Sequence, residues 1–163
     1  MKANELSCKD LMVGDWVQIV EPCKYAGAIG RIKTLIDHKD DENAYFKVFL
    51  KSNTIHIGIE DICSEDIRPI PLTPEILEKN GFEKTQIHGE KQDDIFQCFD
   101  GEIIIEVGIY DPNFILIHYR YETPDGINSG ELSSIVKVDG GKFYIHELQH
   151  ALRLCGIEKE IIL

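Results

Sequence analysis

The chain has 163 residues, of which 43% are hydrophobic and 28% are charged, and its formal net charge is −12. This composition is ordinary for a folded protein and excludes a fibre or a fully disordered chain. The charge is uneven, because residues 1–70 carry 9 basic and 12 acidic groups whereas residues 71–163 carry 8 and 17. Such an acidic balance argues against a general binder of nucleic acid or anionic membrane, which would cluster lysine and arginine.

The compartment expected from the sequence is the cytoplasm. The first residues lack the apolar core of a signal peptide, and no apolar run approaches the roughly 20 residues that span a bilayer. The five cysteines are odd in number and widely spaced, without a CxxC pair. They are expected to be reduced thiols rather than disulfides or zinc ligands, and no cofactor is predicted.

In chain order, the first half shows short strand patterns separated by turns. Alternation of inward and outward residues predicts a strand at 15–20, and paired glycines open a second at 27–36. Strands at 45–50 and 54–59 follow, joined around 51–53. Short strands at this spacing predict a small barrel or sandwich.

A junction is expected at Pro69 and Pro71, because two such prolines cannot both lie in a central strand. A helix is predicted directly afterwards. Thr73 is a suitable N-cap and Pro74 suits the first helical position. Asn80-Gly81 is predicted to end the helix, with Phe82 folding back onto its last turn.

The second half continues with strands. Asp100-Gly101 predicts a hairpin between strands at 94–99 and 102–107. A strand at 113–119 follows, then a long polar loop at 122–130, strands at 134–138 and 143–145, and a final helix. The apolar runs 103–105 and 114–117 predict central strands that are covered on both faces. The predicted fold is α+β: a small barrel at 1–70, followed at 71–163 by an antiparallel sheet with two flanking helices.

The first half resembles the opening of an SH3-like small barrel of the KOW type. The resemblance lies in Val13-Gly-Asp-Trp-Val17 before a strand and Tyr25-Ala-Gly-Ala-Ile-Gly-Arg31 before the next, and it covers about residues 11–67. It implies binding of RNA or protein. The corresponding candidate surface is Lys24, Tyr25, Arg31 and Lys33, with the tyrosine available for base stacking.

The whole chain also resembles a family of small uncharacterised proteins from Bacteroides-type gut bacteria, their phages and mobile elements. The residues that carry this resemblance are 1–6, the stretch 69–77 with Asn80-Gly-Phe82, and 146–156. The family implies no activity.

The segment His146-Glu-Leu-Gln-His150 matches the HExxH pattern of zinc peptidases, in which the two histidines bind zinc and Glu147 acts as the base. A third ligand is missing, since the position where a metzincin has its third histidine is Gly156. The apolar stripe of the predicted helix also lies opposite the histidines, at Leu148, Ala151, Leu152 and Cys155, so both histidines are expected to face solvent. The match is therefore interpreted as fortuitous, and no metal is predicted.

The sequence leaves three functions open. The favoured one is a non-enzymatic binding or adaptor protein of phage or mobile-element origin that acts through contacts with a partner protein. The alternatives are a nucleic-acid-associated protein that uses the barrel, and a small zinc peptidase that uses the HExxH segment. The sequence does not decide between an intimate two-domain monomer and a homodimer, or whether the acidic half mimics nucleic acid.

Overall fold

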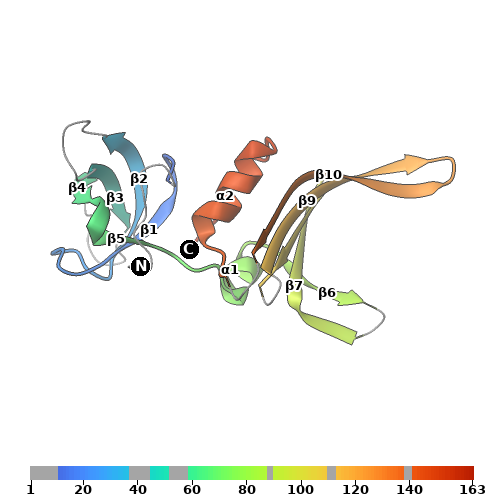
Figure 1. Ribbon diagram of the computed structural model, residues 1–163, viewed down its shortest axis with the longest axis horizontal. Helices are drawn as coiled ribbons and strands as arrows, with labels where there is room; N and C mark the ends of the chain where they lie inside the picture. Colours follow the sequence, from blue (N-terminus) through green and yellow to red (C-terminus); the bar gives the residue numbers. More distant parts are fainter. Residues whose placement is uncertain (1–10, 37–44, 52–58, 88–89, 110–112, 138–140) are drawn as a thin grey trace. The chain divides into compact units, whose positions relative to one another are not determined.

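The computed structural model describes residues 11–36, 45–51, 59–87, 90–109, 113–137 and 141–163. The chain divides into two compact units, Met1–Ile70 (unit 1) and Pro71–Leu163 (unit 2). Each unit contains one five-stranded antiparallel sheet, and unit 2 also contains two short helices, so the fold class is α+β (Figure 1). Within the described ranges, no helix has the length and apolar character needed to cross a membrane.

Unit 1 is a curled antiparallel sheet with strand order β4-β3-β2-β1-β5. On its inner face, buried strand residues join Leu11 in one apolar cluster, formed by Leu11, Val17, Ile19, Ile32, Val48, Ile62 and Ile67. The strands are β1 (Trp16–Ile19), β2 (Ile29–Ile36), β3 (Tyr45–Lys51), β4 (Ile59–Cys63) and β5 (Ile67–Pro69).

Two predictions for unit 1 are not confirmed by the described residues. The strand predicted at 54–59 lies almost entirely outside the described residues, and β4 begins where that prediction ended. The closed barrel is not seen, because the described strands include no ladder that joins β4 to β5. Unit 1 is therefore described as a five-stranded antiparallel sheet.

Unit 2 is an up-and-down meander with strand order β10-β9-β8-β7-β6. The predicted Asp100-Gly101 turn is confirmed: it joins β7 to β8, with Gly101 at φ 61°, a left-handed conformation that favours glycine. The strands are β6 (Glu83–Ile87), β7 (Glu90–Asp100), β8 (Ile103–Gly108), β9 (Asn113–Thr123) and β10 (Gly126–Lys137).

Helix α1 (Pro74–Lys79) begins and ends as its sequence predicts. The Thr73 hydroxyl accepts a hydrogen bond from the Ile76 amide, and Pro74 occupies the first turn. After the helix the Phe82 amide donates to the Leu77 carbonyl at 3.0 Å, which closes a Schellman turn through Gly81 at φ 78°. Phe82 is consequently fully buried.

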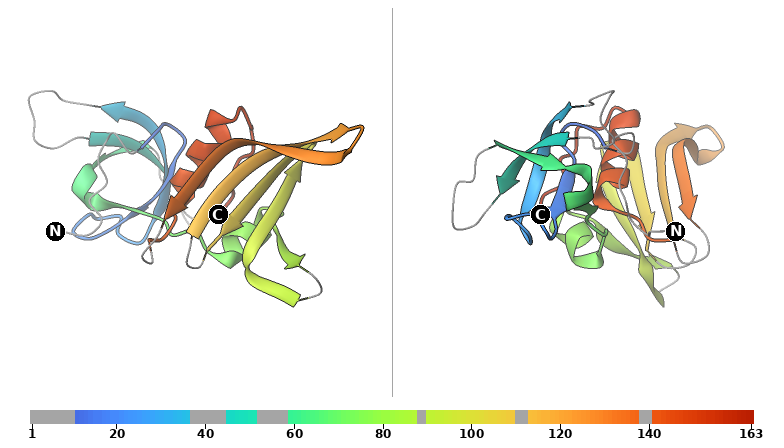
Figure 2. Two further views of the ribbon diagram at one scale, coloured as in Figure 1. Left: turned by 45° about the vertical axis from the view of Figure 1, so that its right-hand side comes forward. Right: turned by 60° about the vertical axis from the view of Figure 1, so that its left-hand side comes forward.

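Helix α2 (Ile145–Leu154) contacts β9 and lies over one face of the unit 2 sheet (Figures 1 and 2). We call this the covered face. Strand register places its apolar residues in adjacent rows, and their side chains are buried: Phe96, Cys98, Ile105, Val107, Ile115 and Ile117. The opposing helix residues are Ile145, Leu148, Ala151 and Leu152, all fully buried.

The opposite face of the same sheet, which we call the open face, differs from the prediction of cover on both sides. Register places Phe99, Ile104 and His118 in one row and Glu106 and Leu116 in the next. Of these only Ile104 is buried, while Phe99 is 58% exposed. The two apolar runs do lie in the interior strands β8 and β9, as predicted. Cover on both faces is wrong for β9, where Ile115 and Ile117 are buried but Phe114 and Leu116 are only half-buried.

The prediction of a long loop at 122–130 is also wrong, because most of these residues lie in strands. Residues Asn113–Thr123 and Gly126–Lys137 form one long hairpin, whose end extends past the other strands (Figures 1 and 2). Ile103 is the first residue of β8 and pairs with Tyr119, and the Arg120 amide still donates to the Glu102 carbonyl just before that strand. Among the described strands, the residues of β9 beyond Arg120 pair with β10 alone. We call the segment formed by 119–123 and 126–132 the arm.

Candidate functional site

The HExxH glutamate has a structural role at the start of α2. One Glu147 carboxylate oxygen accepts a hydrogen bond of 2.9 Å from the Tyr144 amide, which is an otherwise unsatisfied donor at the helix N-terminus. The other oxygen lies 2.6 Å from the Lys137 ammonium. This carboxylate therefore caps a helix and pairs with a cation, which are structural roles that the HExxH pattern does not require.

The two histidines do not both face solvent, which corrects the sequence prediction. His146 is 5% exposed and His150 is half-buried. The His146 ring stacks on Tyr144 at 6.0 Å between centroids and meets the His150 ring edge-on at 5.6 Å. Helical periodicity identified one apolar stripe but could not show that an aromatic neighbour outside the helix would cover His146.

The described residues contain no group of three or more His, Cys, Asp or Glu side chains arranged to hold a metal ion. Burial raises the pKa of the Cys155 thiol, the opposite of the shift that an attacking thiolate needs. Neither the HExxH segment nor this cysteine therefore shows the arrangement of a reactive centre.

The arm carries the densest group of exposed apolar side chains in unit 2. Tyr119 and Tyr121 are each 41% exposed, and Ile127 and Leu132 are 64% and 46% exposed. Val136 continues the series along β10 at 57%. Register places Tyr119 and Tyr121 on one face of the ribbon and Ile127 on the other, so the arm exposes apolar side chains on both faces. Tyrosine is enriched at protein interfaces, which makes this ribbon a candidate contact surface.

Local contacts hold the arm in shape. The Tyr119 ring lies over Gly130, its cross-strand partner, where an added Cβ would come within 2.6 Å of the ring. The rings of Tyr119 and Tyr121 lie 5.5 Å apart. Near the tip, the Asn128 amide donates to the Thr123 hydroxyl at 2.8 Å. These contacts matter because a two-stranded ribbon alone is only marginally stable in water.

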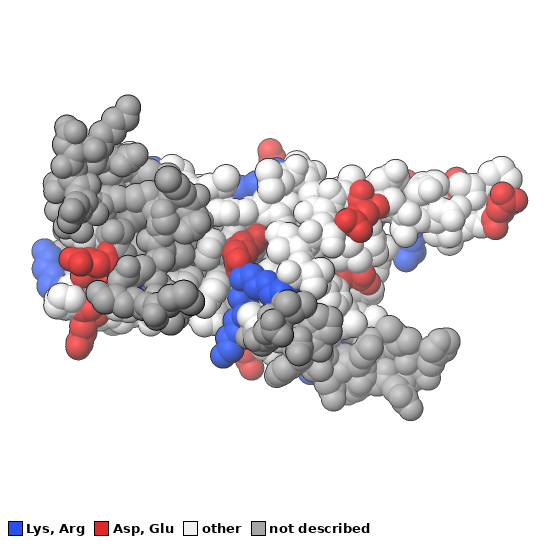
Figure 3. Space-filling model, in the orientation of Figure 1, with Lys and Arg blue, Asp and Glu red and all other residues white. Residues whose placement is uncertain are grey.

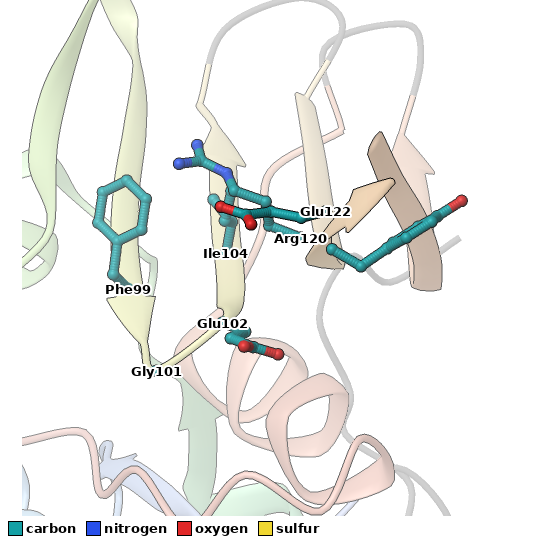
Figure 4. A pocket seen from close by; sticks show the side chains of 7 residues that line it. Phe99, Gly101, Glu102, Ile104, Arg120 and Glu122 are labelled. Atoms are coloured by element: carbon teal, nitrogen blue, oxygen red, sulfur yellow. The ribbon is translucent and has the colours of Figure 1, made fainter. Parts of the chain in front are cut away.

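A shallow pocket of about 240 Å³ lies where the arm leaves the sheet, and the side chains that line it are drawn in Figure 4. The exposed Phe99 ring stands on one side, with Arg120 and Glu122 from β9 on the other. Glu102 from the β7–β8 turn and Ile104 from β8 complete it, and the Arg120 amide donates to the Glu102 carbonyl at 2.8 Å. The pocket combines an aromatic surface with charges of both signs.

The surface charge of the arm is sparse and predominantly acidic. In Figure 3 most of the arm is uncharged, with acidic side chains at its tip. The exposed charged residues of the arm are Arg120, Glu122 and Glu131, and the exposed Asp125 lies in the turn that joins its two strands. The arm thus resembles the rest of unit 2 in sign and differs from it in its apolar content.

The four residues of the predicted surface in unit 1 occupy two places. Lys24 and Tyr25 lie in the turn between β1 and β2, where the Lys24 ammonium is 4.5 Å from the Tyr25 ring centre and Tyr25 packs against the core. Arg31 and Lys33 lie on β2, on either side of the buried Ile32.

Arg31 and Lys33 instead make cation–π contacts with aromatic residues that are not part of the predicted surface. Register places Trp16, Arg31 and Phe49 in one row across β1, β2 and β3. The Arg31 guanidinium lies 5.4 Å from the Trp16 ring and the Lys33 ammonium 5.6 Å from Phe49, which is 42% exposed. Alternation placed Trp16 on a strand face, but the neighbour it would meet depends on register.

Comparison of the chain with protein-family models, with curated proteins and with solved structures finds no match.

Proposed function

We propose that this is a non-enzymatic binding protein that acts through protein–protein contacts made by the arm of unit 2. The observation that carries the proposal is the exposure of Tyr119, Tyr121, Ile127 and Leu132 on one projecting ribbon. Apolar side chains on a two-stranded ribbon cannot be buried by the ribbon itself, so a partner surface is their natural cover. The capping role of Glu147 supports a non-enzymatic assignment over a zinc peptidase.

Photo-crosslinking from the arm tests this proposal. A photoreactive phenylalanine replaces Tyr121 in one variant and Leu154, which is 79% exposed on α2, in a matched control. Irradiation in cells of the native host is expected to give a discrete protein adduct from position 121 and none from position 154. Identical adducts from both positions, or none from position 121, would remove the arm as the contact surface.

We also infer that unit 1 is an SH3-like small barrel of the KOW type. In a flat sheet the edges β4 and β5 would lie about 19 Å apart, at roughly 4.8 Å per strand. Yet only the 3₁₀ turn Ser64–Asp66 connects them, and four Cα steps reach about 15 Å when fully extended and much less in a helical turn. The short connection supports a sheet curled until its edges approach each other.

A second candidate function is nucleic-acid association through unit 1. The supporting observation is the row Trp16, Arg31 and Phe49 with Lys33 beside it, which offers cations and an exposed ring on one sheet face. Bases stack on such rings while cations neutralise phosphates. Lys47 lies on the next row, although its ammonium is 3.5 Å from Asp61.

Fluorescence anisotropy with a labelled single-stranded oligouridine tests the second candidate at physiological salt. Phe49→Ala with Lys33→Glu should weaken binding by about tenfold or more, since base stacking alone contributes roughly 1–3 kcal/mol. Lys24→Glu is the matched charge control in the adjoining turn. Undetectable binding of the unaltered protein at low salt would eliminate this candidate.

A further inference from the structure

β10 is one of the two edge strands of the unit 2 sheet in the described residues, and it is the longest strand of that sheet. This strand has 12 residues and ends the order β10-β9-β8-β7-β6. Within the described part of the chain, no strand pairs with its outer side. A free edge of this length presents a row of N–H and C=O groups that can accept another extended chain.

The usual protections of an edge strand are weak here. β10 contains no proline, and its one lysine, Lys137, is engaged by Glu147 at 2.6 Å. One register shift, between Glu131 and Ser133, interrupts the ladder with β9. The stretch Gly126–Glu131 before it is regular and mostly exposed, which leaves room for a short added strand.

Charge decides which occupant suits this edge. Glu131 on β10, Glu122 on the neighbouring strand and Asp125 at the turn are all exposed. Against these three negative charges the arm has one exposed cation, Arg120, so the group keeps a net charge of −2. Unit 2 as a whole carries 17 acidic and 8 basic residues, a net of −9. A second copy would bring a like-charged surface to the edge, whereas a basic segment would be attracted to it.

We propose that the β10 edge binds an extended basic segment of a partner protein, which adds to the sheet as a sixth strand. Backbone hydrogen bonds to Gly126–Glu131 supply the affinity. Register places Ile127 and Glu131 on the same face as Glu122, so the segment is expected to alternate β-branched residues with lysine or arginine on that face. This inference rests on the proposed protein-binding function and names the mode and the chemistry of the contact.

Three short capped peptides and the full chain test it. The first alternates lysine with valine and threonine, the second has the same sequence with alternate amides N-methylated, and the third has glutamate in place of lysine. Amide hydrogen exchange and NMR titration should show protection of Gly126–Glu131 by the first peptide. The N-methylated and glutamate peptides should bind about tenfold more weakly or worse, because one cannot pair and the other is repelled.

A charge variant provides a second, independent test of the proposal. Glu131→Lys is expected to weaken the lysine peptide several-fold, while Glu158→Lys, at an exposed position in the C-terminal segment, should not. Equal binding of the N-methylated peptide, or protection elsewhere than β10, would overturn edge pairing. If the protein self-associates and its β10 amides are protected without peptide, the basic partner segment is also ruled out, and a second copy of the chain is the occupant of the edge.

The peptide experiments on β10 and the crosslinking experiment at position 121 can give different results, so edge pairing and the proposed function can fail separately. An adduct from position 121 combined with unprotected β10 amides would keep the arm as the contact surface and remove the edge-pairing mode. Absence of both would remove both.

Discussion

At the scale of single residues, Asn80 links the end of α1 to the C-terminal segment. Its side-chain amide donates to the Ile76 carbonyl at 2.7 Å and to the Ile162 carbonyl at 2.9 Å, and its oxygen accepts from the Ile162 amide at 2.7 Å. The adjacent Ile161 is 1% exposed. One buried side chain therefore satisfies both backbone groups of a residue 82 positions away in the sequence.

Asn80→Ala should lower the free energy of unfolding by about 2–3 kcal/mol, because three hydrogen bonds are lost and partly buried backbone groups lose their partners. Urea titration followed by circular dichroism measures the change. Asn128→Ala, which removes one exposed hydrogen bond to Thr123, is the control and should cost no more than about 0.5 kcal/mol. Equal effects of the two substitutions would contradict the anchoring role.

The capping role of Glu147 can be tested by its contribution to the stability of the protein. Glu147→Ala and Lys137→Met should each lower the free energy of unfolding by about 1 kcal/mol. The coupling energy in the double variant should be only roughly 0.5 kcal/mol, because both side chains are 26% exposed and solvent screens the ion pair. Thermal unfolding of the four proteins gives the cycle. Additive effects would mean that the ion pair contributes nothing to the start of α2.

At the scale of secondary-structure elements, the two tyrosines and Gly130 determine how well the arm is formed. Gly130→Ala places a methyl group where the Tyr119 ring lies, at 2.6 Å from it. Since the ring is partly exposed it can swing aside, and the expected cost is about 1 kcal/mol from lost cross-strand packing. The same substitution combined with Tyr119→Ser should cost less than the sum of the two single changes.

Hydrogen exchange of the arm amides measures this effect, with Gly108→Ala as a comparison. Gly108 is buried and an added Cβ would collide with the Phe114 ring, so its cost should be larger, about 1–3 kcal/mol. A larger loss at Gly130 than at Gly108 would contradict this order.

How far the sequence predicted the elements depended on the range of the interactions involved. The limits of α1 were predictable because Thr73, Pro74 and Gly81 act within one turn of the helix. The arm was missed because residues 122–130 are polar and lack an apolar alternation, and their pairing with β9 is supported by a tyrosine over a glycine. The Trp16–Arg31–Phe49 row was missed because it follows from register across three strands.

At the scale of the whole molecule, the division at Ile70–Pro71 predicts independent folding. Unit 2 has a core of its own, which joins the covered face of its sheet to α2 and to Phe82. Residues 71–163 expressed alone should therefore unfold cooperatively, with amide NMR shifts like those in the full chain except near the cut. A fragment that binds a hydrophobic dye and lacks dispersed shifts would contradict this expectation.

The arm has a further consequence for how the chain can vary. Its strands meet at a turn between Thr123 and Gly126, far along the ladder from the core pair Ile115 and Ile135. Removing or adding the same even number of residues on each strand next to that turn would preserve the alternation and every pairing nearer the core. Reach and partner choice can therefore diverge among homologous chains by changes in arm length, while the sheet and α2 stay constant.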